Sequence, residues 1–239
     1  MKKMLITLLI LAALCSLASC TLFQEIDVKS ENTQNTLETT SDTGTGSKPL
    51  TYEKVDVYTL QTESENGMYT SFVLSTPDKE VAFNANQWEG TESKIFVEDL
   101  TGDGFPEVIA VFVSGTGTGI HAEEVHVFDG KTLEEYPVEN LATTLSEHLS
   151  LSASDSEFII EVSKQTYRID KTSLPVEPEA LFETISIGFI NGYTVSDGIL
   201  HYTTECGCAM GAYCGTLDAA LKYSGDAFVF DHASFVESE

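Results

Sequence analysis

The sequence predicts a mainly β or α+β domain built from antiparallel sheets with one or a few helices. Short runs of β-branched and aromatic residues, many with alternating polar and apolar side chains, recur through residues 51–239 and favour strands. Turn-forming pairs separate several of these runs, namely Asp129-Gly130, Asn191-Gly192, Asp197-Gly198 and Gly225-Asp226. No internal repeat of fixed period is visible, so a complete propeller, which needs about four or more similar blades, is not expected.

The expected strands follow one another at short intervals. In chain order they cover residues 52–60, 68–76, 79–83, 93–100, 107–115, 123–129, 158–163, 165–170, 185–190, 192–196, 199–205, 217–224 and 227–236. Only residues 138–149 show a convincing helical period, with Leu141, Leu145 and Leu149 on one apolar stripe. The sequence therefore predicts several hairpins and at least one helix.

The first nineteen residues have the pattern of a secretory signal peptide. Lys2 and Lys3 precede an apolar run over residues 4–14, and small residues follow. The segment Leu17-Ala18-Ser19-Cys20 resembles the bacterial lipobox. This resemblance implies that Cys20 carries acyl lipid, such as palmitate, and becomes the new N-terminus. The alternative is an ordinary secretory signal with a chance cysteine at the cleavage point.

Residues 20–50 are rich in Ser, Thr, Asn and Glu and contain few apolar residues. Such a segment buries too little apolar surface to offset the entropy of ordering, so we expect a flexible, lipidated tether. Residues 51–239 then form a single globular domain. No later stretch approaches the roughly 18 apolar residues that a membrane helix needs. We therefore expect an extracytoplasmic lipoprotein, held at the bacterial cell membrane by the lipid on Cys20.

The chain is strongly acidic. Without Lys2 and Lys3, it has 10 basic and 38 acidic residues, a formal net charge of −28. Such a charge repels nucleic acid and anionic lipid headgroups, and it concentrates cations near the surface. Nucleic acid is therefore not an expected partner.

The stretch DLTGDGFPEV, residues 99–108, has the spacing of a calcium loop. Counted as an EF-hand loop, it places ligands and the turn glycine at positions 1, 3, 5, 6, 7 and 9, which are Asp99, Thr101, Asp103, Gly104, Phe105 and Glu107. Position 12 is Ala110 instead of the required glutamate, and the flanking segments are expected to be strands. An EF-hand is therefore excluded.

A strand, this D-x-T-x-D-G-x-x-E loop and a second strand resemble the calcium loops of FG-GAP and VCBS-type repeats of integrin-like propellers. The wider stretch 99–129 resembles a single VCBS-like segment in lipid-anchored proteins of Firmicutes type. The resemblance implies calcium as cofactor. It also implies side-chain oxygens from Asp99, Thr101 and Asp103, the carbonyl of Phe105 and the carboxylate of Glu107. The alternative is an acidic turn in which Asp99 and Asp103 accept backbone N–H groups.

Three cysteines of the domain, Cys206, Cys208 and Cys214, lie within CGCAMGAYC. Because export favours disulfides, we expect Cys214 to pair with Cys206 or Cys208, leaving one thiol over. A zinc site lacks a clear fourth ligand, and a redox-active C-x-x-C is absent.

Two further motifs do not support catalysis. The glycine-rich run at residues 114–119 has no lysine after it, so it is a strand connection instead of a phosphate cradle. His121 and His126 have H-x4-H spacing, which in a strand places them on opposite faces, at the surface or an edge, and does not suit zinc. No catalytic residue is assigned.

The sequence thus predicts a lipid-anchored, extracytoplasmic calcium-binding module that binds a surface ligand or protein and has no enzymatic activity. The alternative is a surface-anchored hydrolase acting on glycans or peptides, with a cleft near residues 114–119. This alternative requires a pocket lined by carboxylates or histidines with perturbed pKa values.

Overall fold

We describe residues 55–238 of a computed structural model. The expected signal peptide at 1–19, the lipidation of Cys20 and the tether at 20–50 lie outside these residues and stay predictions. Among the described residues, no helix is long and apolar enough to cross a membrane.

The described residues form fifteen strands, one α-helix and two 3₁₀ helices, and this mainly β content confirms the expected fold class. The strands are β1 (Asp56–Thr59), β2 (Met68–Ser75), β3 (Glu80–Trp88), β4 (Lys94–Glu98), β5 (Glu107–Gly117), β6 (Ile120–Phe128), β7 (Glu135–Tyr136), β8 (Leu149–Ala153), β9 (Glu157–Val162), β10 (Gln165–Asp170), β11 (Leu181–Ser186), β12 (Asn191–Ser196), β13 (Ile199–Ala209), β14 (Ala212–Tyr223) and β15 (Phe228–Glu237). The helices are α1 (Leu141–His148), η1 (Lys171–Ser173) and η2 (Pro178–Ala180).

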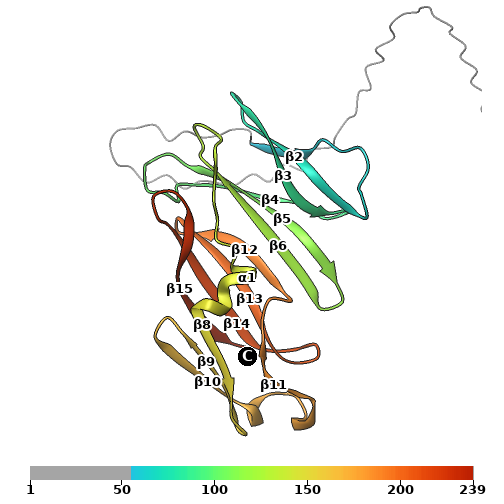
Figure 1. Cartoon of the computed structure of the whole chain (residues 1–239), viewed down its shortest axis with the longest axis vertical. Helices are drawn as coiled ribbons and strands as arrows, with labels where there is room; N and C mark the ends of the chain where they lie inside the picture. Colours follow the sequence, from blue (N-terminus) through green and yellow to red (C-terminus); the bar gives the residue numbers. More distant parts are fainter. Residues whose placement is uncertain (1–54, 239) are drawn as a thin grey trace, which may run out of the picture. The chain divides into compact units, whose positions relative to one another are not determined.

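The strands form four antiparallel sheets, and none of them closes into a propeller (Figure 1). Three sheets follow chain order, as β1-β2-β3, β4-β5-β6-β7 and β8-β9-β10. The fourth has the order β11-β13-β14-β15, and β12 also pairs with β13. The expected hairpin between the two strands that flank the acidic loop is therefore present, as β4 and β5.

Both faces of strand β5 are covered by other parts of the protein. Val108, Ala110 and Phe112 on one face contact residues of the β1–β3 sheet, including Phe72. Ile109 and Val111 on the other face belong to the largest core cluster. Burial on both faces explains why this strand is a continuous apolar run instead of an alternating one.

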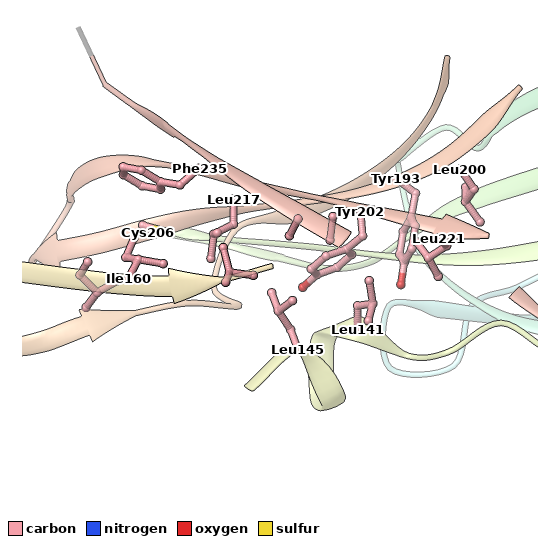
Figure 2. Close-up of a cluster of buried hydrophobic side chains, with 14 of the residues drawn as sticks. Leu141, Leu145, Ile160, Tyr193, Leu200, Tyr202, Cys206, Leu217, Leu221 and Phe235 are labelled. Atoms are coloured by element: carbon pink, nitrogen blue, oxygen red, sulfur yellow. The ribbon is translucent and has the colours of Figure 1, made fainter. Parts of the chain in front are cut away.

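The largest core cluster joins sheet and helix residues. Leu141 and Leu145 of α1 lie beneath the aromatic rings of Tyr193 and Tyr202 (Figure 2). These two tyrosine rings meet edge to face at 5.2 Å between centroids, a favourable arrangement. The expected helical stripe is confirmed for its first two leucines, whereas Leu149 begins β8.

Two of the expected turns are present, whereas several other expected boundaries were wrong. The pairs Asp197-Gly198 and Gly225-Asp226 do make turns with positive φ angles. The pair Asn191-Gly192 instead starts β12, with no positive φ angle at either residue. Strand β11 begins at Leu181, before the expected 185–190, and the short strand β7 was not expected. Tertiary pairing decides these edges, because local turn propensity is weaker than a sheet register that buries side chains.

Gly215 offers a test of the close packing between β14 and β15. A Cβ atom at this position would overlap the carbonyl oxygen of Val236 and the ring of Phe235. We expect Gly215→Ala to lower the free energy of unfolding by about 2–3 kcal/mol, as overpacking does. The matched control is Gly117→Ala, whose Cβ would lie 4.0 Å from that of Ile120. Urea denaturation measures both, and equal effects would contradict the packing argument.

Candidate functional site

The acidic loop joins β4 to β5 and turns sharply at two glycines. Gly102 and Gly104 have φ angles of 75° and 85°, which are in the left-handed region that glycine adopts without strain. No atom lies within 4 Å of a Cβ built at either position. The glycines are therefore required by backbone conformation and not by crowding.

Backbone N–H groups hold the two aspartates of this loop. Asp99 Oδ1 accepts from Gly102 N at 2.8 Å and Oδ2 accepts from Gly104 N at 2.9 Å. Asp103 Oδ1 accepts from Phe105 N at 2.8 Å. The structure therefore has the turn hydrogen bonds of the acidic-turn alternative. These bonds do not exclude a cation, because each carboxylate oxygen has two lone pairs.

Glu107 closes the loop from the first position of β5. The residue is 2% exposed, and its Oε2 accepts from Leu100 N at 2.8 Å and from Thr101 N at 3.1 Å. Burial raises the pKa of Glu107, the two backbone hydrogen bonds lower it, and Asp99 and Asp103 raise it again, so the net shift is upward. Glu107 is thus a buried carboxylate with two acidic neighbours inside one hairpin loop.

Lys131 is the one cation that forms an ion pair with this loop in the described part of the chain. Its Nζ lies 3.3 Å from Asp103 Oδ2 and 3.0 Å from the centroid of the Phe105 ring. Both members of the ion pair are substantially exposed, so the pair contributes little stability. It compensates one of the three carboxylates.

The donor set of the loop suits a hard cation such as calcium, which takes about 6–8 oxygen ligands. Asp99 keeps a spare lone pair on each oxygen, and Asp103 keeps one on Oδ1. The hydroxyl of Thr101 donates to Glu107 Oε1 at 3.4 Å, which leaves its own lone pairs available. Within residues 55–238, no three His, Cys, Asp or Glu side chains are arranged as a ready metal site. Coordination therefore requires the side chains to adjust.

A second polar site, not expected from the sequence, is a cleft of about 340 Å³ between β3, β6, β12 and the start of α1. Glu123 of β6 is 8% exposed. Its Oε2 accepts from Lys94 Nζ at 2.8 Å and from Tyr193 N at 2.9 Å, and its Oε1 lies 3.0 Å from His121 Nε2. Burial alone would raise the pKa of Glu123, but these hydrogen bonds outweigh burial and lower it.

Two more glutamates of the cleft have histidine partners. Glu124 accepts hydrogen bonds from the backbone and side chain of Asn86, and its Oε1 lies 3.5 Å from His126 Nε2. Glu139 Oε1 lies 2.7 Å from His148 Nε2, and its Oε2 accepts from the backbone of β15. Burial would raise the pKa of both glutamates, yet their hydrogen bonds lower it.

His126 was expected at the surface or an edge, but its side chain is mostly buried. Its side chain is only 15% exposed, and its ring lies 5.2 Å from that of Phe83 and 5.8 Å from that of Phe112. Burial lowers the pKa of His126, but Glu124 and Glu135 raise it by more, and the net pKa is raised. His121 pairs with Glu123 and not with His126, so the two histidines do not share a metal site.

The glycine-rich run at 114–119 is a strand connection, as expected. It covers the end of β5 and the turn into β6, and Gly119 has a φ angle of 71°. Ser114 is its only residue among those lining the cleft.

The three cysteines at the β13–β14 turn are buried free thiols in this structure. The thiol of Cys208 donates to Ala212 O at 3.5 Å and that of Cys214 to Cys206 O at 3.3 Å, and the thiols of Cys208 and Cys214 lie close enough to affect each other's pKa. Burial raises the pKa of all three, that of Cys214 to about 12. The expected disulfide stays a prediction, and the contact between the two thiols favours Cys208 over Cys206 as the partner of Cys214.

Comparison with protein families, with curated proteins and with solved structures finds no match to this chain. The function is therefore inferred from the residues of this chain.

The disulfide has a direct test. In protein exported to an oxidising compartment, we expect Cys208 and Cys214 to be cross-linked. Cyanogen bromide cleaves after Met210, which lies between them, so only a disulfide keeps the two fragments joined. The fragments should stay joined in Cys206→Ala and separate in Cys208→Ala. A cross-link that survives in Cys208→Ala would show that Cys206 is the partner.

Glu107 gives a pH test. A carboxyl group whose pKa is raised in the folded chain adds stability that is fully present below its unfolded pKa and lost as the pH rises through the folded value. In EGTA, the free energy of unfolding of wild type minus that of Glu107→Gln should therefore fall as the pH rises from 4.5 to 7. Urea denaturation at several pH values measures the difference, and a rise would contradict the upward shift.

Proposed function

We propose that this chain is a lipid-anchored extracytoplasmic calcium-binding module with a binding or interaction role and no enzymatic activity. The observation that carries the calcium proposal is the loop of β4 and β5, where Asp99 and Asp103 provide oxygens beside Glu107, whose pKa is raised by burial and by these two acidic neighbours. A bound divalent cation would relieve the repulsion of Glu107 by these neighbours. The other carboxylate groups described above have Lys or His partners.

Calcium in this loop would act first by stabilising the hairpin of β4 and β5. The loop connects two strands of the sheet on which the β1–β3 sheet packs. A cation that binds only the folded state stabilises it by about 2.7 kcal/mol at a hundredfold excess over its Kd. Asp99, Thr101, Asp103, the carbonyl of Phe105 and Glu107 remain the proposed ligands. Glu107 Oε1 is the more accessible of its two donor oxygens, because Oε2 already accepts two N–H groups.

The membrane link and the location rest on the sequence. The signal pattern of residues 1–19 and the lipobox-like segment ending at Cys20 support export and lipid attachment. The acidic charge supports a role that involves neither nucleic acid nor anionic headgroups.

The cleft supports a second candidate, a hydrolase acting on glycans or peptides, because it is lined by carboxylates and a histidine with shifted pKa values. General acid catalysis by a carboxyl group needs a raised pKa, so that the group holds its proton near neutral pH. The pKa values of Glu123, Glu124 and Glu139 are lowered instead. This direction favours a binding role over hydrolysis.

Thermal unfolding of the purified chain tests the calcium proposal. Relative to EGTA, calcium at about a hundredfold excess over its Kd should raise the Tm by roughly 5–10 °C. Asp99→Ala and Asp103→Ala should abolish the shift, because each removes a proposed side-chain ligand. Equal unfolding curves with calcium and with EGTA would leave the loop as an acidic turn.

The matched control is Glu134→Ala. Glu134 is an exposed carboxylate in the neighbouring turn after β6, and its side chain has no hydrogen bond or ion pair with another described residue. The variant lowers the negative charge by one without touching a proposed ligand. Its calcium shift should equal that of wild type. A matching loss would mean that calcium responds to overall charge and not to this site.

A further inference from the structure

The cleft has features of a binding site beyond its paired glutamates. Tyr193 is 4% exposed and lines the cleft, yet its hydroxyl has no hydrogen bond to another described residue. Figure 2 shows this hydroxyl directed toward α1, the helix whose first residues also line the cleft. No side-chain oxygen of the described residues is both buried and unpartnered, so this hydroxyl reaches the open space of the cleft, where a polar group from outside the chain can bond to it.

Two neutral amides on different elements also line the cleft. Asn84 on β3 and Asn140 before α1 both line the cleft, and neither side chain forms a hydrogen bond with another described residue. By contrast, the amide of Asn191 is fully used, because it accepts from Glu123 N at 3.1 Å and donates to Gly188 O at 3.0 Å. The cleft therefore combines a fixed wall with solvent-facing polar groups that have no partner within the described residues.

The lining is rich in acceptors and poor in cationic donors. Glu123 Oε1, Glu124 Oε2 and Glu139 Oε2 each accept one hydrogen bond and keep a second lone pair. None of the lining residues is Lys or Arg, and His126 is shared between Glu124 and Glu135. An anionic ligand such as a phosphate would meet repulsion here, whereas a ligand rich in N–H donors would be attracted.

The size of the cleft and the spacing of its acidic side chains favour an organic cation over a metal ion as ligand. No three acidic, His or Cys side chains of the described range are close enough to hold a metal, so these acceptors are spread across the cleft. A volume of about 340 Å³ is within the range of small-molecule sites. We propose that this cleft binds a small organic polycation with primary ammonium groups, which bridge the free oxygens of Glu124 and Glu139, with Tyr193 and Asn140 completing the contacts.

An organic polycation is a ligand class for the binding role proposed above, and this inference rests on that role. It does not depend on calcium, because the cleft and the loop share no residue. Spermidine binding should therefore persist in Asp99→Ala, the variant expected to lose the calcium shift. Loss of spermidine binding in Asp99→Ala would place the polyamine at the loop and overturn the proposal.

Isothermal titration calorimetry of the full chain with spermidine tests the site. We expect one spermidine per chain with a Kd below about 1 mM, weakened by added salt. Triethylene glycol, a neutral chain of similar length, should bind at least about tenfold more weakly. Several equivalents of weakly bound spermidine, or equal binding of the glycol, would overturn the proposal.

Matched variants localise the binding. Glu124→Gln should weaken spermidine by roughly tenfold, the effect of one lost charge-assisted hydrogen bond, while the exposed control Glu63→Gln should not. Tyr193→Phe removes only the hydroxyl and should weaken binding by about threefold, whereas Tyr69→Phe outside the cleft should not. If Glu124→Gln does not fold, the spermidine affinities of Tyr193→Phe and Asn140→Ala test whether the ligand binds in the cleft. Unchanged affinity in both would overturn the proposal.

Discussion

The buried carboxylate of Glu123 is the interaction on which the arrangement of the sheets depends. It accepts from the backbone of Tyr193 in β12 and from Lys94 in β4, and so connects the sheet of β4–β7 with that of β11–β15. Gly192 leaves room for it, since a Cβ there would lie 3.0 Å from Glu123 Oε2. Removing one partner of such a buried pair costs far more than the pair contributes, so all its members are needed together.

The same structure handles negative charge in two different ways. Around the cleft, Glu123, Glu124 and Glu139 each have a basic partner, and hydrogen bonds lower their pKa values despite burial. In the loop, Glu107 has backbone N–H partners but two acidic neighbours, and its pKa is raised. The loop is thus the place where a small cation would change the charge balance most, whereas each glutamate of the cleft already has one basic partner and keeps a free lone pair.

The sequence allowed the local features to be predicted. Asp99, Asp103, Gly104 and Glu107 lie within nine residues, and the hairpin around them follows from two adjacent strand-forming runs. The helix was predicted because Leu141 and Leu145, one helical turn apart, form an apolar stripe, which α1 buries. The turn at Asn191-Gly192 was wrong because Asn191 serves the register of β12 and the backbone of β6, which no local pattern reveals.

The cleft was missed for the same physical reason. Its groups come from β3, β6, β12 and the start of α1, and the hydrogen bond from Tyr193 N to Glu123 spans 70 residues of sequence. The acidic pair Glu123-Glu124 was visible, but successive residues of a strand face opposite sides, so the pair alone gives no site. What creates the cleft is the approach of β6 to β12, where His121 of β6 forms a parallel bridge with Ile190, the residue before β12. A site built by such a crossing needs the three-dimensional register, whereas a loop site needs only spacing along the chain.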